Sequence, residues 1–119
     1  MINAVFERDN YRLTVKGHAN SGESGHDLVC AAVSVLTDTL VLNIKRLKKQ
    51  GVIKKYKTER KNGKTVLSCV SDDSYAAIVS LIFQAFCLGL RQLAKDCPEN
   101  ISFEIISPQG VEREKENSV

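Results

Sequence analysis

The feature that most constrains the fold is a pair of long segments in which apolar residues recur every three or four positions. The first covers residues 27–49, with Gly51 after its end, and the second covers residues 74–95, with Pro98 just beyond it. This spacing places apolar side chains along one side of an α-helix, and glycine or proline commonly follows a helix end. We therefore predict two long helices.

Segments in which apolar and polar residues alternate surround these helices and predict strands. The alternation is found at residues 2–6, 11–15, 52–57, 66–70 and 101–105. Asn62-Gly63, between the third and fourth segments, is the dipeptide most typical of a tight hairpin. The order β-β-α-β-β-α-β predicts an α+β fold of two layers, with two helices on one face of a small mixed sheet. Residues 1–108 are expected to form one domain, and the polar tail at 109–119 is expected to be disordered.

Both predicted helices are apolar over a wider arc than one sheet can cover. The excess comprises Val35, Val41 and Leu42 in the first helix, and much of the set Ile78, Val79, Leu81, Ile82, Phe83, Phe86, Leu88, Leu90 and Leu93 in the second. A helix that is apolar on most sides must be covered on most sides. In so short a chain a second copy is the expected cover, which predicts a homodimer. The alternative is that the two helices only cover each other.

The start of the chain and its cysteines indicate a reducing compartment. Arg8, Asp9 and Arg12 follow the start too soon for a signal peptide, so a cytoplasmic location is expected. The apolar run at residues 76–90 is interrupted by polar residues and is expected to be too short to cross a membrane. None of the four cysteines forms a C-x-x-C pair, so free thiols are expected. We interpret three of them as small buried or half-buried residues, namely Cys69, Cys87 and Cys97.

A histidine and a cysteine flank a glycine-rich stretch. His18 follows the second predicted strand, and Cys30 lies in the first or second turn of the first helix. A helix N-terminus or a neighbouring imidazolium lowers the pKa of a thiol, and a histidine beside it can take its proton. Asp27 and Ser34, three residues before and four after Cys30, share its helical face. The pattern is compatible with a nucleophilic cysteine, with N–H groups at the helix start holding a developing oxyanion.

Each of these residues also has a structural interpretation. Cys30 can be a core residue of an apolar helix, and His18 a surface residue. Either Ser24 or Asp27 can cap the helix, and Ser34 can be a small packing residue. Metal binding is a further alternative, but the spacing matches no strong zinc pattern, and we expect neither a metal nor another cofactor. The permitted ligand types in this stretch are His18, His26, Asp27 and Cys30.

A basic region surrounds the second hairpin, in a chain whose net charge is +3. Only Tyr56 interleaves with the basic residues, so base stacking has little support and no direct nucleic-acid function is expected. Contact with phosphate groups remains open. The region comprises Lys45, Arg46, Lys48, Lys49, Lys54, Lys55, Lys57, Arg60, Lys61 and Lys64.

Two motif halves are separated by the short glycine-rich stretch. They are Gly17-His18-Ala19 and Gly25-His26-Asp27-Leu28-Val29-Cys30-Ala31-Ala32-Val33-Ser34. Together they resemble the signature of the ribosomal-processing cysteine proteases, the Prp family. The resemblance covers the whole chain in length and element order. It implies a bacterial, homodimeric endopeptidase that removes the N-terminal extension of a large-subunit ribosomal protein.

The resemblance also implies roles for single residues. His18 corresponds to the catalytic histidine and Cys30 to the nucleophile, which acts through a thioester acyl-enzyme. Asp27 and Ser34 fall on supporting positions. The flexible loop expected to close over the substrate contains Gly17, Gly22 and Gly25.

A second hypothesis is a non-catalytic, ribosome-associated binding module. It uses the basic hairpin, with Lys54, Lys55 and Lys57, and treats the glycine-rich stretch as a docking element. The two hypotheses differ in whether Cys30 or the lysines are required.

Overall fold

The computed structural model describes residues 1–17 and 24–112, and only the backbone of residues 24–27. Its elements are β1 (Ile2–Glu7), β2 (Arg12–Lys16), α1 (Ser24–Lys49), β3 (Ile53–Lys61), β4 (Lys64–Ser71), α2 (Ala76–Asp96), β5 (Ile101–Ser107) and β6 (Gly110–Glu112). Short 3-10 turns follow β1 (η1, Arg8–Asn10) and precede α2 (η2, Asp73–Tyr75).

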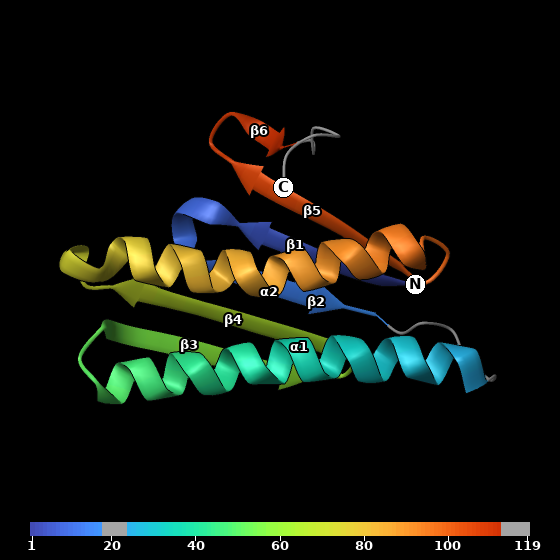
Figure 1. Cartoon of the computed structure of the whole chain (residues 1–119), viewed down its shortest axis with the longest axis horizontal. Helices are drawn as coiled ribbons and strands as arrows, with labels where there is room; N and C mark the ends of the chain where they lie inside the picture. Colours follow the sequence, from blue (N-terminus) through green and yellow to red (C-terminus); the bar gives the residue numbers. More distant parts are fainter. Residues whose placement is uncertain (18–23, 113–119) are drawn as a thin grey trace.

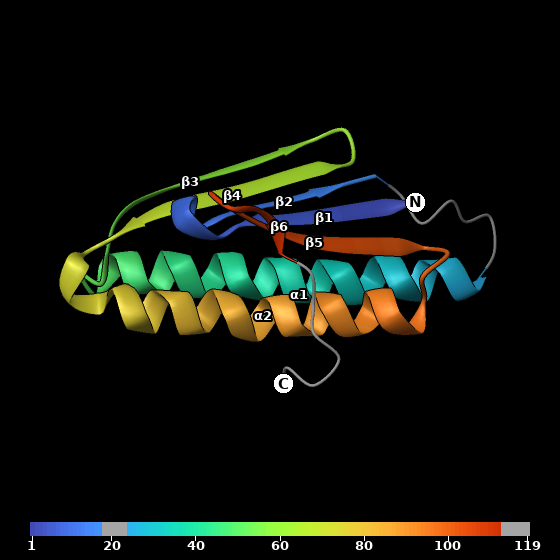
Figure 2. The same ribbon diagram turned by 90° about the horizontal axis from the view of Figure 1, so that it is seen from above.

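The strands form one mixed sheet in the order β3-β4-β2-β1-β5-β6. Neighbouring strands are antiparallel, except β1 and β5, which are parallel. The two helices lie side by side on one face of this sheet (Figure 1, Figure 2). The predicted two-layer α+β fold is therefore confirmed.

The core lies between the sheet and the helices. Alternate residues of β1, Ile2, Ala4 and Phe6, are buried beneath the helices, as the sequence pattern predicts. The ring of Phe6 stacks on that of Phe83 in α2, with 5.3 Å between the ring centroids. This contact ties α2 to the middle of the sheet.

The hairpin of β3 and β4 turns at the predicted dipeptide. Asn62 and Gly63 both have positive φ angles, 45° and 76°. Two such residues match the twist of the flanking strands, and the strands run up to the turn, with Lys61 paired to Lys64. The hairpin prediction is confirmed.

Two predicted boundaries are wrong. α1 begins at Ser24, the earlier of the two helix starts considered, so Gly25 and His26 belong to the helix and not to the predicted loop. The apolar periodicity starts only at Leu28 and therefore does not reveal the polar first turn. Residues 110–112 of the predicted tail form β6, which pairs with β5, and three residues are too few for alternation to be recognised. Residues 113–119 lie outside the described part of the chain.

The expectation about membrane-spanning length is also corrected. By length and apolar composition alone, Leu28–Lys49 and Asp73–Asp96 are each long and apolar enough to cross a membrane. The second apolar run is longer than residues 76–90 because α2 continues to Asp96. However, both helices bury one side against the sheet, where Leu40 and Phe83 are fully buried. Core packing accounts for the apolar character of that side.

The side of the helices away from the sheet carries exposed apolar residues, which we call the outer helix face. They are between 46% and 73% exposed and comprise Leu28, Val35 and Leu42 of α1 with Ile78, Leu81 and Leu88 of α2. The two helices do contact each other, since the Leu36 side chain lies against Gly89. This contact leaves the outer helix face uncovered, so mutual covering does not account for these six residues.

Candidate functional site

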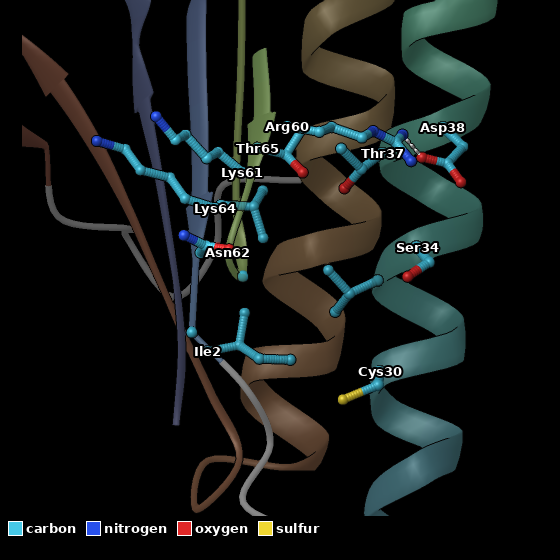
Figure 3. A pocket seen from close by; sticks show the side chains of 14 residues that line it. Ile2, Cys30, Ser34, Thr37, Asp38, Arg60, Lys61, Asn62, Lys64 and Thr65 are labelled. Atoms are coloured by element: carbon cyan, nitrogen blue, oxygen red, sulfur yellow. Dashed lines mark ion pairs between the residues drawn. The ribbon is translucent and has the colours of Figure 1, made fainter.

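A groove of about 400 Å³ runs between α1 and the β3–β4 hairpin (Figure 3). Its walls come from the first half of α1, from the ends of β1 and β2, and from the hairpin turn. The lining residues are Ile2, Val15, Gly17, Cys30, Val33, Ser34, Thr37, Asp38, Arg60, Lys61, Asn62, Gly63, Lys64 and Thr65. The groove thus combines an apolar floor with polar walls.

Cys30 is the seventh residue of α1, and its half-buried free thiol points into the groove (Figure 3). Only the first four N–H groups of a helix lack a helical acceptor, and the effect of the helix dipole falls off within the first turn. Cys30 therefore lies in the second turn, one of the two positions expected from the sequence, and outside the first turn where the helix dipole acts most strongly.

The other cysteines differ from Cys30 in their surroundings. Cys69 and Cys87 are buried, as predicted, and burial raises the pKa of their thiols to about 11 and about 12. Such thiols are almost entirely protonated at neutral pH and are poor nucleophiles. Cys97 is half-buried at the end of α2 and does not line the groove.

The predicted site residues divide into described and undescribed positions. Ser34 is exposed and lines the groove one helical turn after Cys30, as its spacing predicts. Asp27 lies in the first turn of α1, in the part where only the backbone is described. His18 and Gly22 lie outside the described residues.

Gly17 lines the same groove and is held in place there. Its φ angle is +104°, and a Cβ atom at this position would lie 2.3 Å from the carbonyl oxygen of Met1. Its N–H donates to the carbonyl oxygen of Gly63 at 2.8 Å. Only glycine fits such a position, so Gly17 fixes the end of β2 at the groove wall.

Three residues farther along the groove are missing from the sequence-based site. Asp38 of α1 forms an ion pair with Arg60 of β3 across the groove (Figure 3). Thr37 is 5% exposed, and its hydroxyl has no hydrogen-bond partner among the described residues. Their spacing from Cys30, seven and eight residues along a helix, is the signal that could have identified Thr37 and Asp38. No comparable signal points to Arg60.

The described residues contain no cluster of three or more His, Cys, Asp or Glu side chains that could hold a metal ion. The side chains of residues 18–27, which include three of the four candidate ligand residues named in the sequence, are not among those searched. No cofactor site is assigned.

A family model described as cysteine protease Prp matches residues 1–102. No match was found among curated protein sequences. The structure of SMU.848 from Streptococcus mutans is similar, with 28% sequence identity and a TM-score of 0.63 over 89% of this chain and 92% of that one.

Two structures of an essential ribosomal processing protease, Prp from S. aureus, have the same fold. One contains a covalently linked product peptide and is 20% identical, with a TM-score of 0.65. The other contains a substrate peptide and is 19% identical, with a TM-score of 0.63. Each alignment covers 87% of this chain and 96% of the S. aureus chain.

Proposed function

The chain belongs to the cysteine protease Prp family, and from this membership we propose that it is the endopeptidase that removes the N-terminal extension of a large-subunit ribosomal protein in the bacterial cytoplasm. One observation carries the proposal. The Cys30 thiol opens into a groove that is also lined by Gly17, the residue directly before His18.

The proposed reaction is acyl transfer through a thioester. His18 takes the proton of the Cys30 thiol, and the thiolate sulfur attacks the scissile carbonyl carbon. The peptide C–N bond breaks, and His18 returns the proton to the leaving amine. Water then hydrolyses the thioester, which frees the thiol and leaves a carboxylate on the extension. The covalently linked product peptide in the S. aureus structure supports a covalent route of this kind.

Asp27 and Ser34 are proposed to support this pair. Ser34 lines the groove one turn from Cys30 and can donate a hydrogen bond to the thiolate. Asp27 lies in the first turn of α1, where a carboxylate can orient His18 or cap the helix. The segment that includes Gly22 is proposed to close over the substrate. Gly17 acts as the fixed end of that segment, because its backbone N–H donates to the carbonyl oxygen of Gly63.

We further propose that the protein is a homodimer that buries the outer helix face. The six residues are each at least 46% exposed, and they span both helices. Large apolar side chains exposed on two neighbouring helices favour an interface. In α1 three of them recur every seven residues, a spacing that packs well against another helix.

A ribosome-associated binding module remains the second candidate. Lys16, Lys64 and Lys61 are register partners on three adjacent strands and therefore form one row across the sheet. Like charges directly opposite one another are destabilising, so such a row favours an anionic partner. In this candidate the thiol of Cys30 has no role.

The substitution Cys30→Ala separates the candidates, with Cys97→Ala as the matched control for a half-buried thiol. A peptide that carries the ribosomal extension is incubated with each variant, and its cleavage is followed by mass spectrometry. We expect no cleavage by Cys30→Ala and undiminished cleavage by Cys97→Ala. Undiminished cleavage by a folded Cys30→Ala variant would refute the protease proposal. Salt-sensitive ribosome binding lost in a Lys16→Glu/Lys61→Glu variant would then favour the binding module.

A further inference from the structure

We propose that the Thr37 hydroxyl anchors the backbone of a bound peptide, and that the groove between Cys30 and the Asp38–Arg60 ion pair is the subsite for one side of that peptide. This inference rests on the proposed function, since it supposes that a peptide is cut at Cys30. The inference adds Thr37, which lies outside the two motif halves at residues 17–19 and 25–34.

The first observation is the isolation of the Thr37 hydroxyl. The side chain is 5% exposed, lines the groove, and has no hydrogen-bond partner among the described residues. A threonine inside a helix commonly returns its hydroxyl hydrogen to the carbonyl one turn earlier, which would satisfy it locally. Here that bond is absent. A buried polar group without a partner is costly, and a bound peptide can supply the missing partner.

The second observation is the alignment of Thr37 with the thiol. Seven residues separate it from Cys30, which is nearly two full helical turns, so both side chains lie on the same side of α1 (Figure 3). The rise along the helix between them is roughly 10 Å at 1.5 Å per residue. An extended peptide covers that length with about three residues at 3.3 Å each. Thr37 is therefore placed to meet a backbone group about three residues from the scissile bond.

The third observation is that the groove has a floor and an end. Val15 and Val33 provide an apolar floor between the thiol and Thr37. Beyond Thr37, the ion pair between Asp38 and Arg60 joins α1 to β3. The subsite is thus bounded by a reactive sulfur at one end and a salt bridge at the other. Because the proposed partner is a backbone group and not a side chain, Thr37 would contribute affinity without sequence preference.

The test compares Thr37→Val, which keeps the shape and removes the hydroxyl, with Thr37→Ser, which keeps the hydroxyl. Steady-state cleavage of the extension peptide is measured for the full-length variants. Loss of one neutral hydrogen bond predicts a KM increase of about five- to tenfold for Thr37→Val. We expect kcat to change less than KM, and Thr37→Ser to stay close to the wild type.

A set of peptides with one backbone amide at a time replaced by an ester locates the contact. An ester about three residues from the cut should raise KM for the wild type and for Thr37→Ser. The same ester should leave the KM of Thr37→Val unchanged. Equal KM values for all three enzymes, or ester effects that are the same in all three at every position, would overturn the proposal. Thermal unfolding of Thr37→Val checks that the variant folds, and if it does not, Thr37→Ala, which also lacks the hydroxyl, takes its place in the KM comparison and the ester scan.

The two proposals fail in different ways. If the wild type does not cleave the peptide, or Cys30→Ala cleaves it equally, the protease function fails. The Thr37 contact is then tested by peptide binding, measured by fluorescence anisotropy with the Cys30→Ala and Cys30→Ala/Thr37→Val variants. If cleavage depends on Cys30 and the Thr37 variants are indistinguishable, the function stands and the subsite assignment falls.

Discussion

Gly17 donates its backbone N–H to the carbonyl oxygen of Gly63 at 2.8 Å, and this bond ties the residue before His18 to the turn of the β3–β4 hairpin. The same two glycines line the groove that holds the Cys30 thiol. The end of β2 that precedes His18 is therefore tied to the hairpin turn by a backbone hydrogen bond, on the wall of the groove opposite α1.

The substitution Gly17→Ala should destabilise the protein more than Gly51→Ala. Both glycines have positive φ angles, but a Cβ atom at Gly17 would also lie 2.3 Å from the Met1 carbonyl oxygen, whereas Gly51 has open space around it. We expect a loss of about 1 kcal/mol for Gly51→Ala from backbone strain alone, and about 2–3 kcal/mol for Gly17→Ala. Urea denaturation of both variants measures the difference, and equal losses would contradict the role of the Met1 contact.

Iodoacetamide at neutral pH should label Cys30 well before the core cysteines. The thiolate is the reactive form, and the pKa values of Cys69 and Cys87 are raised to about 11 and about 12 by burial. At pH 7.5 less than about one in a thousand of these thiols is ionised. Peptide mapping by mass spectrometry gives the order of labelling. Cys97, which is half-buried outside the groove, is the control: labelling of Cys30 no faster than Cys97 would argue against activation by His18.

Raised thiol pKa values also predict weaker folding stability at alkaline pH. Both buried thiols stay protonated in the folded protein above pH 9, whereas in the unfolded chain they ionise near their ordinary value. Their contribution is therefore fully present below about pH 9 and is lost as the pH rises toward 11 and 12. A Cys87→Ala variant, compared with the wild type by urea denaturation between pH 8 and pH 10.5, should lose less stability over this range. Parallel pH profiles of the two proteins would contradict the prediction.

The layers of the fold could be predicted because each rests on a local pattern. The alternation of Ile2, Ala4 and Phe6 and the Asn62-Gly63 turn are read directly from neighbouring residues. The groove could not be predicted, because it depends on which face of α1 meets β3. Arg60 and Asp38 are 22 positions apart in the sequence, and nothing local links them. The unpartnered state of the Thr37 hydroxyl likewise depends on packing.

Charge on the outer helix face should convert the proposed dimer into monomers. Leu42→Glu and Leu81→Glu place carboxylates within an apolar surface, whereas Val111→Glu alters an exposed apolar residue on β6 and serves as the control. We expect the wild type and Val111→Glu to sediment as dimers at micromolar concentration, and the other two as monomers. A monomeric wild type would remove the dimer proposal. Co-sedimentation of the wild type with phosphatidylcholine vesicles, absent in Leu42→Glu, would show that lipid covers this face instead.

Neutralising the Asp38–Arg60 ion pair should affect long peptides more than it affects stability. Both side chains are about half exposed, and exposed pairs of this kind contribute about 1 kcal/mol or less to folding. Asp38→Asn and Arg60→Gln should therefore unfold close to the wild type, and the double variant should show little coupling in stability. The pair nevertheless borders the groove beyond Thr37, so a peptide that extends more than about three residues past the cut on that side reaches it. We expect KM to change for such a peptide and to stay constant for one truncated at the Thr37 position. The same KM change for both lengths would place the ion pair outside the path of the substrate.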